Sequence, residues 1–473
     1  MGGQNGGNLG GEGPGQRPVR RMDRHQGKKN RKSKPGKPDK QLSRQSPPAQ
    51  PDKRLSRQSP PAQPDNGGKR SWYRSTLFLT GLGVLLLVLT AGGVLLSVKL
   101  RSASGSATGA SADDAATVAS TTGMDAGATT EMSATEKIVA GMTLEQKIGQ
   151  MMMVGFDGKA PDASITTEVR DEGIGGVILY GNNIDSTGQV RQMDAALQQL
   201  AASQPAQLMI ATDQEGGSTR RFKDIGPNYS EPMIGEMRGG AGASSALNLS
   251  AAAARQLKQI GINTNLAPVA DVSGGWGTLM DGRSYGDDPQ IDAELVGNAV
   301  KGYNNATTIS CTKHFPGLGS ADDDPENTLP KVDKSLADLQ ASDLVPFTAA
   351  IQNDAPMIMV THVAVPALDP TGAPASLSRS VITDLLRNQM GFKGVVITDD
   401  LEMGAITMPV GQAAVAAVAA GADIIMVAHT PAKQEEARTA LIDAVKSGKL
   451  SEDEINKSVT RILDMKMRFR LEH

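Results

Sequence analysis

Short apolar runs alternate with longer amphipathic stretches along the C-terminal part of the chain. Eight of the runs have the length and the continuously apolar character of buried strands. They are Gly149–Gly155, Gly176–Tyr180, Leu208–Thr212, Thr264–Pro268, Thr308–Lys313, Met357–Thr361, Val395–Thr398 and Ile424–Ala428. Helical spacing of apolar residues fills most of the intervals, for example Thr187–Ala202, Ser244–Ile260, Leu336–Gln352 and Pro431–Lys446. This alternation indicates an α/β fold with a parallel sheet covered by helices. Eight strands favour a closed (β/α)8 barrel over an open doubly wound sheet, although periodicity alone leaves the two close.

Two capping boxes predict where the first and last helices begin. Thr143 with Gln146, and Ser451 with Glu454, have the spacing in which the two side chains satisfy each other's backbone N–H groups. The last helix carries one stripe of apolar residues, at Ile455, Val459, Ile462, Leu463 and Phe469. We interpret this stripe as packing against the core.

The first 74 residues have a different composition. Met1–Arg74 carries 18 Lys and Arg against 5 Asp and Glu, with almost no apolar periodicity, so we expect a disordered basic tail. Within it, Pro38–Gln50 recurs nearly unchanged as Pro51–Gln63. Two copies without an apolar face indicate a linker and not a solenoid. The basic charge leaves contact with anionic lipid or nucleic acid open, although membrane topology alone accounts for it.

An uncharged apolar segment follows the tail. Ser75–Val98 has 24 residues, enough to cross about 30 Å of hydrocarbon as a helix. Because Lys and Arg crowd its N-terminal side, we expect residues 1–74 to be cytoplasmic and the rest extracytoplasmic, which predicts a single-pass cell membrane protein. A cleaved signal peptide is the alternative, but both the basic region and the apolar run are long for one. Residues 99–135, rich in Ala, Ser, Thr and Gly, predict a flexible linker.

Residues 136–473 then form one globular domain. They carry 28 Lys and Arg and 42 Asp and Glu, and this acidity argues against nucleic acid as a partner. The single cysteine, Cys311, excludes an internal disulfide. No His or Cys cluster has the spacing of a metal site, the three successive Asp residues 322–324 are at most a weak cation site, and no cofactor is expected. No pattern indicates an oligomeric state.

The densest chemistry lies in Thr312–Pro330, which reads TKHFPGLGSADDDPENTLP. Lys313 and His314 end a predicted strand, and the Pro and Gly residues after them break it. The loop that follows carries Asp322, Asp323, Asp324 and Glu326. A solvated acidic loop is the ordinary interpretation of such a run. The residues KHFPG that precede the acidic run favour a functional loop instead.

This stretch resembles the KHFPGHG…DSH…LP segment of family 3 glycoside hydrolases, in their single-domain β-N-acetylhexosaminidase branch. Four further segments resemble that family in its order: Asp213–Gly217, Ala267–Val272, Arg283–Pro289 and Thr398–Met403. The resemblance runs from about Thr143 to the C-terminus. It implies a TIM-type barrel and the retaining hydrolysis of terminal β-linked N-acetylhexosamine from cell-wall or other extracytoplasmic glycans. A β-glucosidase or β-xylosidase of the same family is an alternative.

Site residues follow from the fold and from the resemblance. A parallel barrel forms its active site at the C-terminal ends of its strands. We therefore expect one shared mouth for the polar residues at those ends, Asp213, Asp271, Lys313, His314, His362 and Asp399. The resemblance makes Asp399 the nucleophile, with capping of the next helix as its structural alternative. Asp400 is the alternative nucleophile by sequence, but we expect it to turn away or to stabilise the next helix. It also implies a sugar-binding set, Asp213, Arg221, Arg283, Lys313 and His314. Arg283 has an alternative partner in Asp287 or Asp288 within a structural turn.

The sequence departs from the family pattern at the acid/base position. Where the family has an aspartate followed two residues later by the acid/base histidine, this chain has Asp324, Pro325 and Glu326. Leu318 replaces the histidine of FPGHG, and Ser218 stands where an arginine usually follows EGG. In one interpretation Glu326 is the proton donor, with its pKa raised by burial or by the charge of Asp324. In the other, the protein binds glycans on the cell surface without hydrolysing them.

Overall fold

The computed structural model of the protein describes residues 132–225, 229–275 and 277–473. The predicted basic tail, the apolar segment Ser75–Val98 and nearly all of the predicted linker lie outside these ranges. Within them, none of the helices combines the length and the apolar character that crossing a membrane requires.

Eight strands close a barrel in the order β1-β10-β9-β8-β7-β6-β3-β2, and every neighbouring pair is parallel. They are β1 (Met152–Val154), β2 (Gly176–Leu179), β3 (Met209–Thr212), β6 (Thr264–Asn265), β7 (Ile309–Phe315), β8 (Met357–Val360), β9 (Val395–Asp400) and β10 (Ile424–Val427). Each lies within or overlaps a predicted run. The pairing of β1 with both β2 and β10 closes the sheet, which confirms the barrel and excludes the open alternative.

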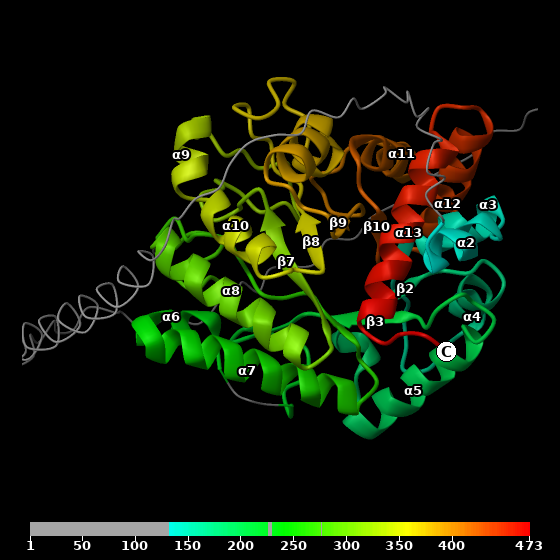
Figure 1. Ribbon diagram of the computed structural model, residues 1–473, viewed down its shortest axis with the longest axis horizontal. Helices are drawn as coiled ribbons and strands as arrows, with labels where there is room; N and C mark the ends of the chain where they lie inside the picture. The colour runs from blue at the N-terminus through cyan, green and yellow to red at the C-terminus, as the bar shows by residue number, and fades with distance from the viewer. Residues whose placement is uncertain (1–131, 226–228, 276) are drawn as a thin grey trace, which may run out of the picture. The chain divides into compact units, whose positions relative to one another are not determined.

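Helices lie around the outside of the strands (Figure 1). They are α2 (Ala134–Ala140), α3 (Leu144–Gln150), α4 (Ala163–Arg170), α5 (Thr187–Leu200), α6 (Glu231–Met237), α7 (Gly239–Gln259), α8 (Pro289–Asn305), α9 (Leu336–Ala341), α10 (Leu344–Gln352), α11 (Val410–Ala420), α12 (Pro431–Lys446) and α13 (Glu452–Arg468). The other helical elements are two short 3-10 turns, η1 (Gly181–Asn183) and η2 (Ala375–Leu377), and a ten-residue π-helix, η3 (Ser380–Gln389). The predicted helical stretch Leu336–Gln352 is helical except for a break at Ser342 and Asp343, where Asp343 is buried against Lys334 at 2.6 Å.

One of the two predicted capping boxes is confirmed, but it begins α3 and not the first helix, because α2 precedes it with a capping box of Ser133 and Glu136. Thr143 Oγ1 accepts from the Gln146 N–H at 3.2 Å, and Gln146 Oε1 accepts from the Thr143 N–H at 2.9 Å. The second was wrong: Ser451 makes no side-chain cap, and Glu454 instead pairs with Lys457 at 2.6 Å. Three acidic residues in the first turn of α13 still favour the positive end of the helix dipole. The apolar stripe of this helix is buried, as predicted.

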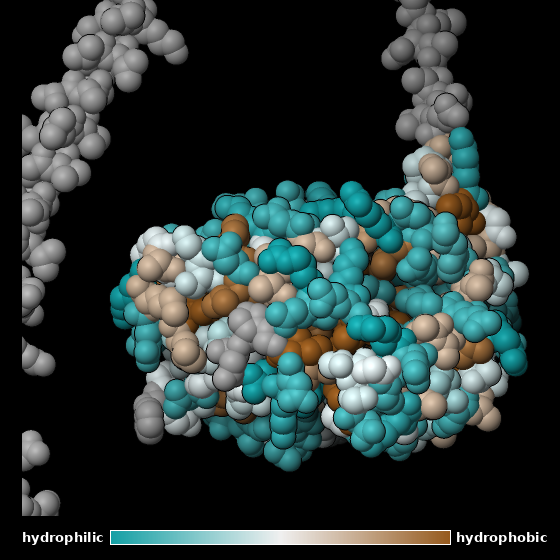
Figure 2. Space-filling model, turned by 90° about the horizontal axis from the view of Figure 1, so that it is seen from below, coloured by the Kyte–Doolittle hydropathy of each residue, from teal (hydrophilic) through white to brown (hydrophobic). Residues whose placement is uncertain are grey.

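The strands are buried along their length and form the core. The outer surface seen in Figure 2 is largely hydrophilic, with hydrophobic side chains showing between polar ones. Because all eight strands are parallel, their C-terminal ends meet at one mouth. Two insertions lie at this mouth: the hairpin of β4 (Gln214–Gly216) and β5 (Thr219–Arg220) after β3, and a 20-residue loop between β7 and α9. These insertions bring further polar side chains over the barrel.

Candidate active site

A cavity of about 520 Å³ opens at the C-terminal ends of the strands. Its walls include all eight residues that the sequence predicted for catalysis or sugar binding, namely Asp213, Arg221, Arg283, Lys313, His314, Asp324, Glu326 and Asp399. They come from β3, the β4–β5 hairpin, the β6–α8 segment, β7 and its loop, and β9. The fold therefore gathers residues that lie up to 186 positions apart in the sequence.

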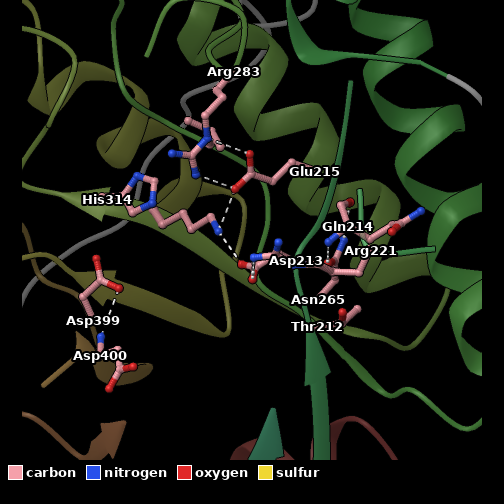
Figure 3. A network of polar contacts seen from close by, with 12 residues as sticks. Thr212, Asp213, Gln214, Glu215, Arg221, Asn265, Arg283, His314, Asp399 and Asp400 are labelled. Atoms are coloured by element: carbon pink, nitrogen blue, oxygen red, sulfur yellow. Dashed lines mark hydrogen bonds and ion pairs between the residues drawn. The ribbon is translucent and has the colours of Figure 1, made fainter. Parts of the chain in front are cut away.

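Five charged side chains form an ionic cluster on one wall (Figure 3). Lys313 Nζ lies 2.8 Å from both Asp213 Oδ1 and Glu215 Oε1. Arg221 contacts the other oxygen of Asp213 at 3.0 Å. Arg283 binds Glu215 with two nitrogens, at 2.7 and 3.0 Å. The predicted sugar-binding residues thus hold one another in place, and Arg283 pairs with Glu215 and not with the alternative partners in its own turn.

The cluster stays ionised because its charges compensate for its burial. Burial disfavours the charged forms of Asp213 and Glu215, but the nearby cations, above all Lys313, outweigh it and hold the pKa of each carboxyl below its usual value. Burial likewise opposes the charge of Lys313, and the two carboxylates raise its pKa in spite of it. A wall of fixed charges of both signs can make charge-assisted hydrogen bonds to sugar hydroxyls without reorganising.

His314 lines the cavity, whereas His362 lies behind the cavity wall. The Nδ1 atom of His314 lies 2.6 Å from Asp271 Oδ2, and Asp271 also accepts from the Leu318 N–H at 2.7 Å. Asp271 therefore orients His314 from behind the cavity wall. His362 is fully buried between Ser376 and the Asp400 carbonyl, at 2.6 and 2.9 Å. The prediction that Asp271 and His362 line the mouth was wrong, because strand-end proximity does not say which way a side chain turns.

Asp399 projects from the end of β9 into the cavity. Its two carboxylate oxygens accept from the Thr361 hydroxyl at 2.9 Å and from the Asp400 N–H at 3.0 Å. Figure 3 shows the Asp399 carboxylate turned toward His314 and the Asp400 carboxylate turned the opposite way. Helix α11 begins eleven residues after Asp399, at Val410, with Pro409 as its N-cap. The helix-capping alternative for Asp399 was therefore wrong, and its carboxylate is held for contact with a ligand.

Glu326 reaches the same cavity from the loop after β7. Asp324 accepts from its backbone N–H at 3.0 Å. The loop is tied to the segment after β9, since the Gly404 and Ala405 N–H groups donate to the carbonyls of Glu326 and Pro325, each at 3.0 Å. Burial raises the pKa of Glu326, and the charges of Asp399 and Asp324 add to the effect. A carboxyl with a raised pKa beside an aspartate is a pattern typical of an acid and a nucleophile.

Three further cavity residues were not predicted. Glu215 bridges Lys313 and Arg283, and it lies in the segment Asp213–Gly217, of which only Asp213 was predicted to bind sugar. Tyr180 and His429 lie just beyond β2 and β10, and their rings stack with centroids 5.2 Å apart. The rule that singled out Asp399, a polar side chain directly after an apolar run, would have found both. Their mutual contact, however, depends on the closure of the barrel.

The other two departures from the family pattern, Leu318 and Ser218, also lie in the cavity wall. Leu318 is buried and contributes an apolar surface, and Ser218 lies on the β4–β5 hairpin. Across the ranges that the structure describes, no group of three or more His, Cys, Asp or Glu side chains is arranged to hold a metal ion.

Comparisons with known proteins agree with this geometry. The family model "Glycosyl hydrolase family 3 N terminal domain" matches residues 143–465. An uncharacterized secreted glycosyl hydrolase of Arthroderma benhamiae is 35% identical over 350 residues, which cover 72% of this chain and 97% of the fungal protein. β-Hexosaminidase A of Pseudoalteromonas piscicida is 31% identical over 369 residues, covering 69% of this chain and 61% of that enzyme.

Among solved structures, a family 3 β-N-acetylglucosaminidase from a Paenibacillus species is similar, with a TM-score of 0.67 and 37% sequence identity. The match covers 70% of this chain and 63% of that one. The chain thus spans somewhat less than two thirds of the Pseudoalteromonas and Paenibacillus proteins. The matched family model, the closed barrel and the residues of its cavity agree on the family of this protein. The chain belongs to glycoside hydrolase family 3, as a glycosidase similar to the β-hexosaminidases.

Proposed function

We propose that this protein removes terminal β-linked N-acetylhexosamine from glycans with retention of configuration, through a covalent intermediate on Asp399. One observation supports this above the others: a hydrogen-bonded aspartate and a glutamic acid with a raised pKa share a cavity with an ionic cluster. Retaining glycosidases need one carboxylate to attack the anomeric carbon and one carboxylic acid to protonate the leaving oxygen. Asp399 takes the first role and Glu326 the second.

The order of bond changes follows from these roles. Asp399 attacks the anomeric carbon while the glycosidic bond breaks, and the Glu326 proton moves to the leaving oxygen. A water molecule then gives its proton to the Glu326 carboxylate and its oxygen to the anomeric carbon, which releases Asp399. Asp324 supports this cycle in two ways: it accepts the backbone N–H of Glu326, and its negative charge favours the protonated form of Glu326.

The choice of sugar rests on the relatives, which are named β-hexosaminidase A and β-N-acetylglucosaminidase. The ionic cluster supports the binding of a sugar, because Asp213 and its cations can make charge-assisted hydrogen bonds to sugar hydroxyls. We propose that the substrates are cell-wall fragments or other extracytoplasmic glycans. This location depends on Ser75–Val98 acting as an uncleaved membrane anchor, with residues 1–74 in the cytoplasm.

A panel of nitrophenyl glycosides tests the substrate class. The full-length protein in detergent should hydrolyse N-acetylglucosaminide or N-acetylgalactosaminide faster than glucoside or xyloside, and NMR should detect the β-anomer as the first product. A faster glucoside or xyloside reaction would move the assignment to the β-glucosidase type. Binding of N-acetylglucosamine with no turnover on any member of the panel would favour a surface glycan-binding protein.

Two further measurements test the residue roles. A fluorinated N-acetylglucosamine derivative with a good leaving group should label the peptide that contains Asp399, and labelling elsewhere would contradict the nucleophile assignment. Glu326→Gln should slow hydrolysis of an unactivated aryl glycoside far more than that of an activated one, since only the former needs the proton. Equal, wild-type rates on both would exclude Glu326 as the acid. Protease treatment of intact cells tests the location, because an external domain should be digested.

A further inference from the structure

His429 lies two residues beyond the end of β10 and lines the cavity that holds Asp399 and Glu326. Its Nε2 atom is 3.2 Å from Asp400 Oδ2, and its side chain is 60% exposed, so the imidazole is paired with a carboxylate yet accessible to a ligand. The Asp400 carboxylate is itself fixed, because it accepts from the backbone N–H groups of Ala428 and Glu402, each at 3.1 Å.

Two other contacts fix the ring. The backbone N–H of His429 donates to Glu402 Oε1 at 2.8 Å. The imidazole stacks on Tyr180 with an interplanar angle of 22°, and Arg221 lies 5.4 Å from the centroid of the same tyrosine ring. Among the residues that the structure describes, none is hydrogen-bonded to Nδ1 of His429. That nitrogen remains available to a group inside the cavity.

The charges around this imidazole are mostly negative. The titratable and charged groups packed near it are Asp399 and Asp400 at the end of β9, Glu402 in the following loop, Asp324 and Glu326 in the loop after β7, Tyr180 beyond β2, Arg221 after β5 and Lys433 in α12. The hydrogen bond to Asp400 raises the pKa of His429 against the effect of partial burial, and Glu326 contributes to the rise. Conversely, a protonated His429 lowers the pKa of Glu326, although burial and the carboxylates dominate there. His429 and Glu326 line the same cavity, and each shifts the pKa of the other in the direction expected for opposite charges.

We propose that His429, oriented by Asp400, is a positioning residue for Glu326, whose carboxylate it stabilises as an imidazolium in the glycosyl-enzyme intermediate. The proposal rests on the proposed function above. In the first step Glu326 gives its proton to the leaving oxygen while the bond between Asp399 and the sugar forms. Asp399 becomes a neutral ester, and the negative charge moves to Glu326. His429 keeps its proton throughout, and Glu326 takes the proton of the attacking water in the second step.

This role explains how a carboxyl in an acidic loop can serve as both acid and base. Asp324, Asp399 and Asp400 favour its protonated form, which the first step needs. The second step needs the ionised form, and a cation held at the end of a barrel strand supplies the opposing charge. Because Asp400 occupies Nε2, the free Nδ1 is the atom available to Glu326.

Two variants separate charge from packing. His429→Phe retains a ring that can stack on Tyr180 without a charge, and His429→Gln retains hydrogen bonding without one. Loss of the imidazolium should raise the pKa of Glu326, so the alkaline limb of kcat/KM should move up by about one pH unit in both variants. The acid limb of kcat should move in the same direction, because the base is then harder to ionise. Unchanged limbs in both variants, with folding verified by thermal unfolding, would overturn the proposal.

A second measurement does not require turnover. In full-length protein with isotope-labelled histidine, Glu326→Gln should lower the imidazole pKa of His429 by about one unit, because removing the carboxylate removes its stabilising charge. The His362 signal, which arises from a buried ring behind the cavity, is the internal control and should not respond. An unshifted His429 would overturn the proposal even if the protein hydrolyses N-acetylhexosaminides. A shifted His429 in a protein without any turnover would instead contradict only the proposed function.

Discussion

Gly404, in the segment after β9, packs closely against the backbone of the loop that carries Glu326. Its N–H donates to the Glu326 carbonyl at 3.0 Å. A Cβ atom at residue 404 would lie 2.5 Å from the Asn327 carbonyl oxygen and 2.8 Å from that of Glu326. Ordinary carbon–oxygen contacts begin at about 3.3 Å, so Gly404→Ala must push the loop back by roughly 0.5–1 Å. Both obstacles are backbone atoms, which cannot move aside by rotating a side chain.

A displacement of this size should affect proton transfer before it affects folding. Misplacing a reacting group by about 1 Å can cost about 100-fold in rate. We expect Gly404→Ala to lower kcat on an unactivated aryl N-acetylglucosaminide by about 10- to 100-fold and that on an activated one by much less, because only the former depends on the acid. Stopped-flow or continuous assays on the two substrates measure the difference.

Gly240→Ala is the matched control, since a Cβ there meets no atom within 4 Å. It should leave both rates unchanged and hold or slightly raise the melting temperature, because alanine is the better helix former. Wild-type rates for Gly404→Ala on both substrates would refute the reasoning. Glu326 would then tolerate displacement, or another group would supply the proton.

Three further outcomes follow from the site and from the opposite end of the barrel. Asp399→Asn should lower kcat by more than about 1,000-fold while binding of N-acetylglucosamine, followed by calorimetry, is retained; a residual rate near wild type would exclude it as the nucleophile. Lys313→Met should destabilise the protein by about 3–5 kcal/mol in urea unfolding, because Asp213 and Glu215 lose the cation they share, and an unchanged midpoint would contradict this. Burial lowers the pKa of Lys466 to about 7 from 10.5, so the unfolded chain binds more protons between these values and stability rises with pH across that window. The free energy of unfolding of the wild type, relative to that of Lys466→Met, should therefore rise by about 1 kcal/mol per pH unit between pH 7.5 and 9.5. A difference that does not depend on pH would show that Lys466 does not take up a proton when the protein unfolds.

The predictions that came from local patterns were mostly accurate. Eight apolar runs predicted eight strands, because most side chains of a strand in a parallel barrel are buried and apolar, as in β8 and β10. Thr143 capped its helix because a capping box involves only four consecutive residues. Ser451 and Glu454 have the same spacing but form no capping box, since Glu454 instead pairs with Lys457 one turn further along. The break at Ser342 also escaped prediction, because it depends on Asp343 being buried against Lys334.

Local patterns in the chain were sufficient to predict the parallel sheet, the segments that resemble family 3 and the charged residues at the strand ends. These features depend on periodicity and on short motifs, which can be recognised without knowing which distant residues are in contact. Tertiary structure alone decided how those charges are shared: Arg283 with Glu215, Asp271 behind His314, and His429 with Asp400. The physical reason is that an ion pair depends on distances of about 3 Å between groups from different strands. Only barrel closure sets such distances.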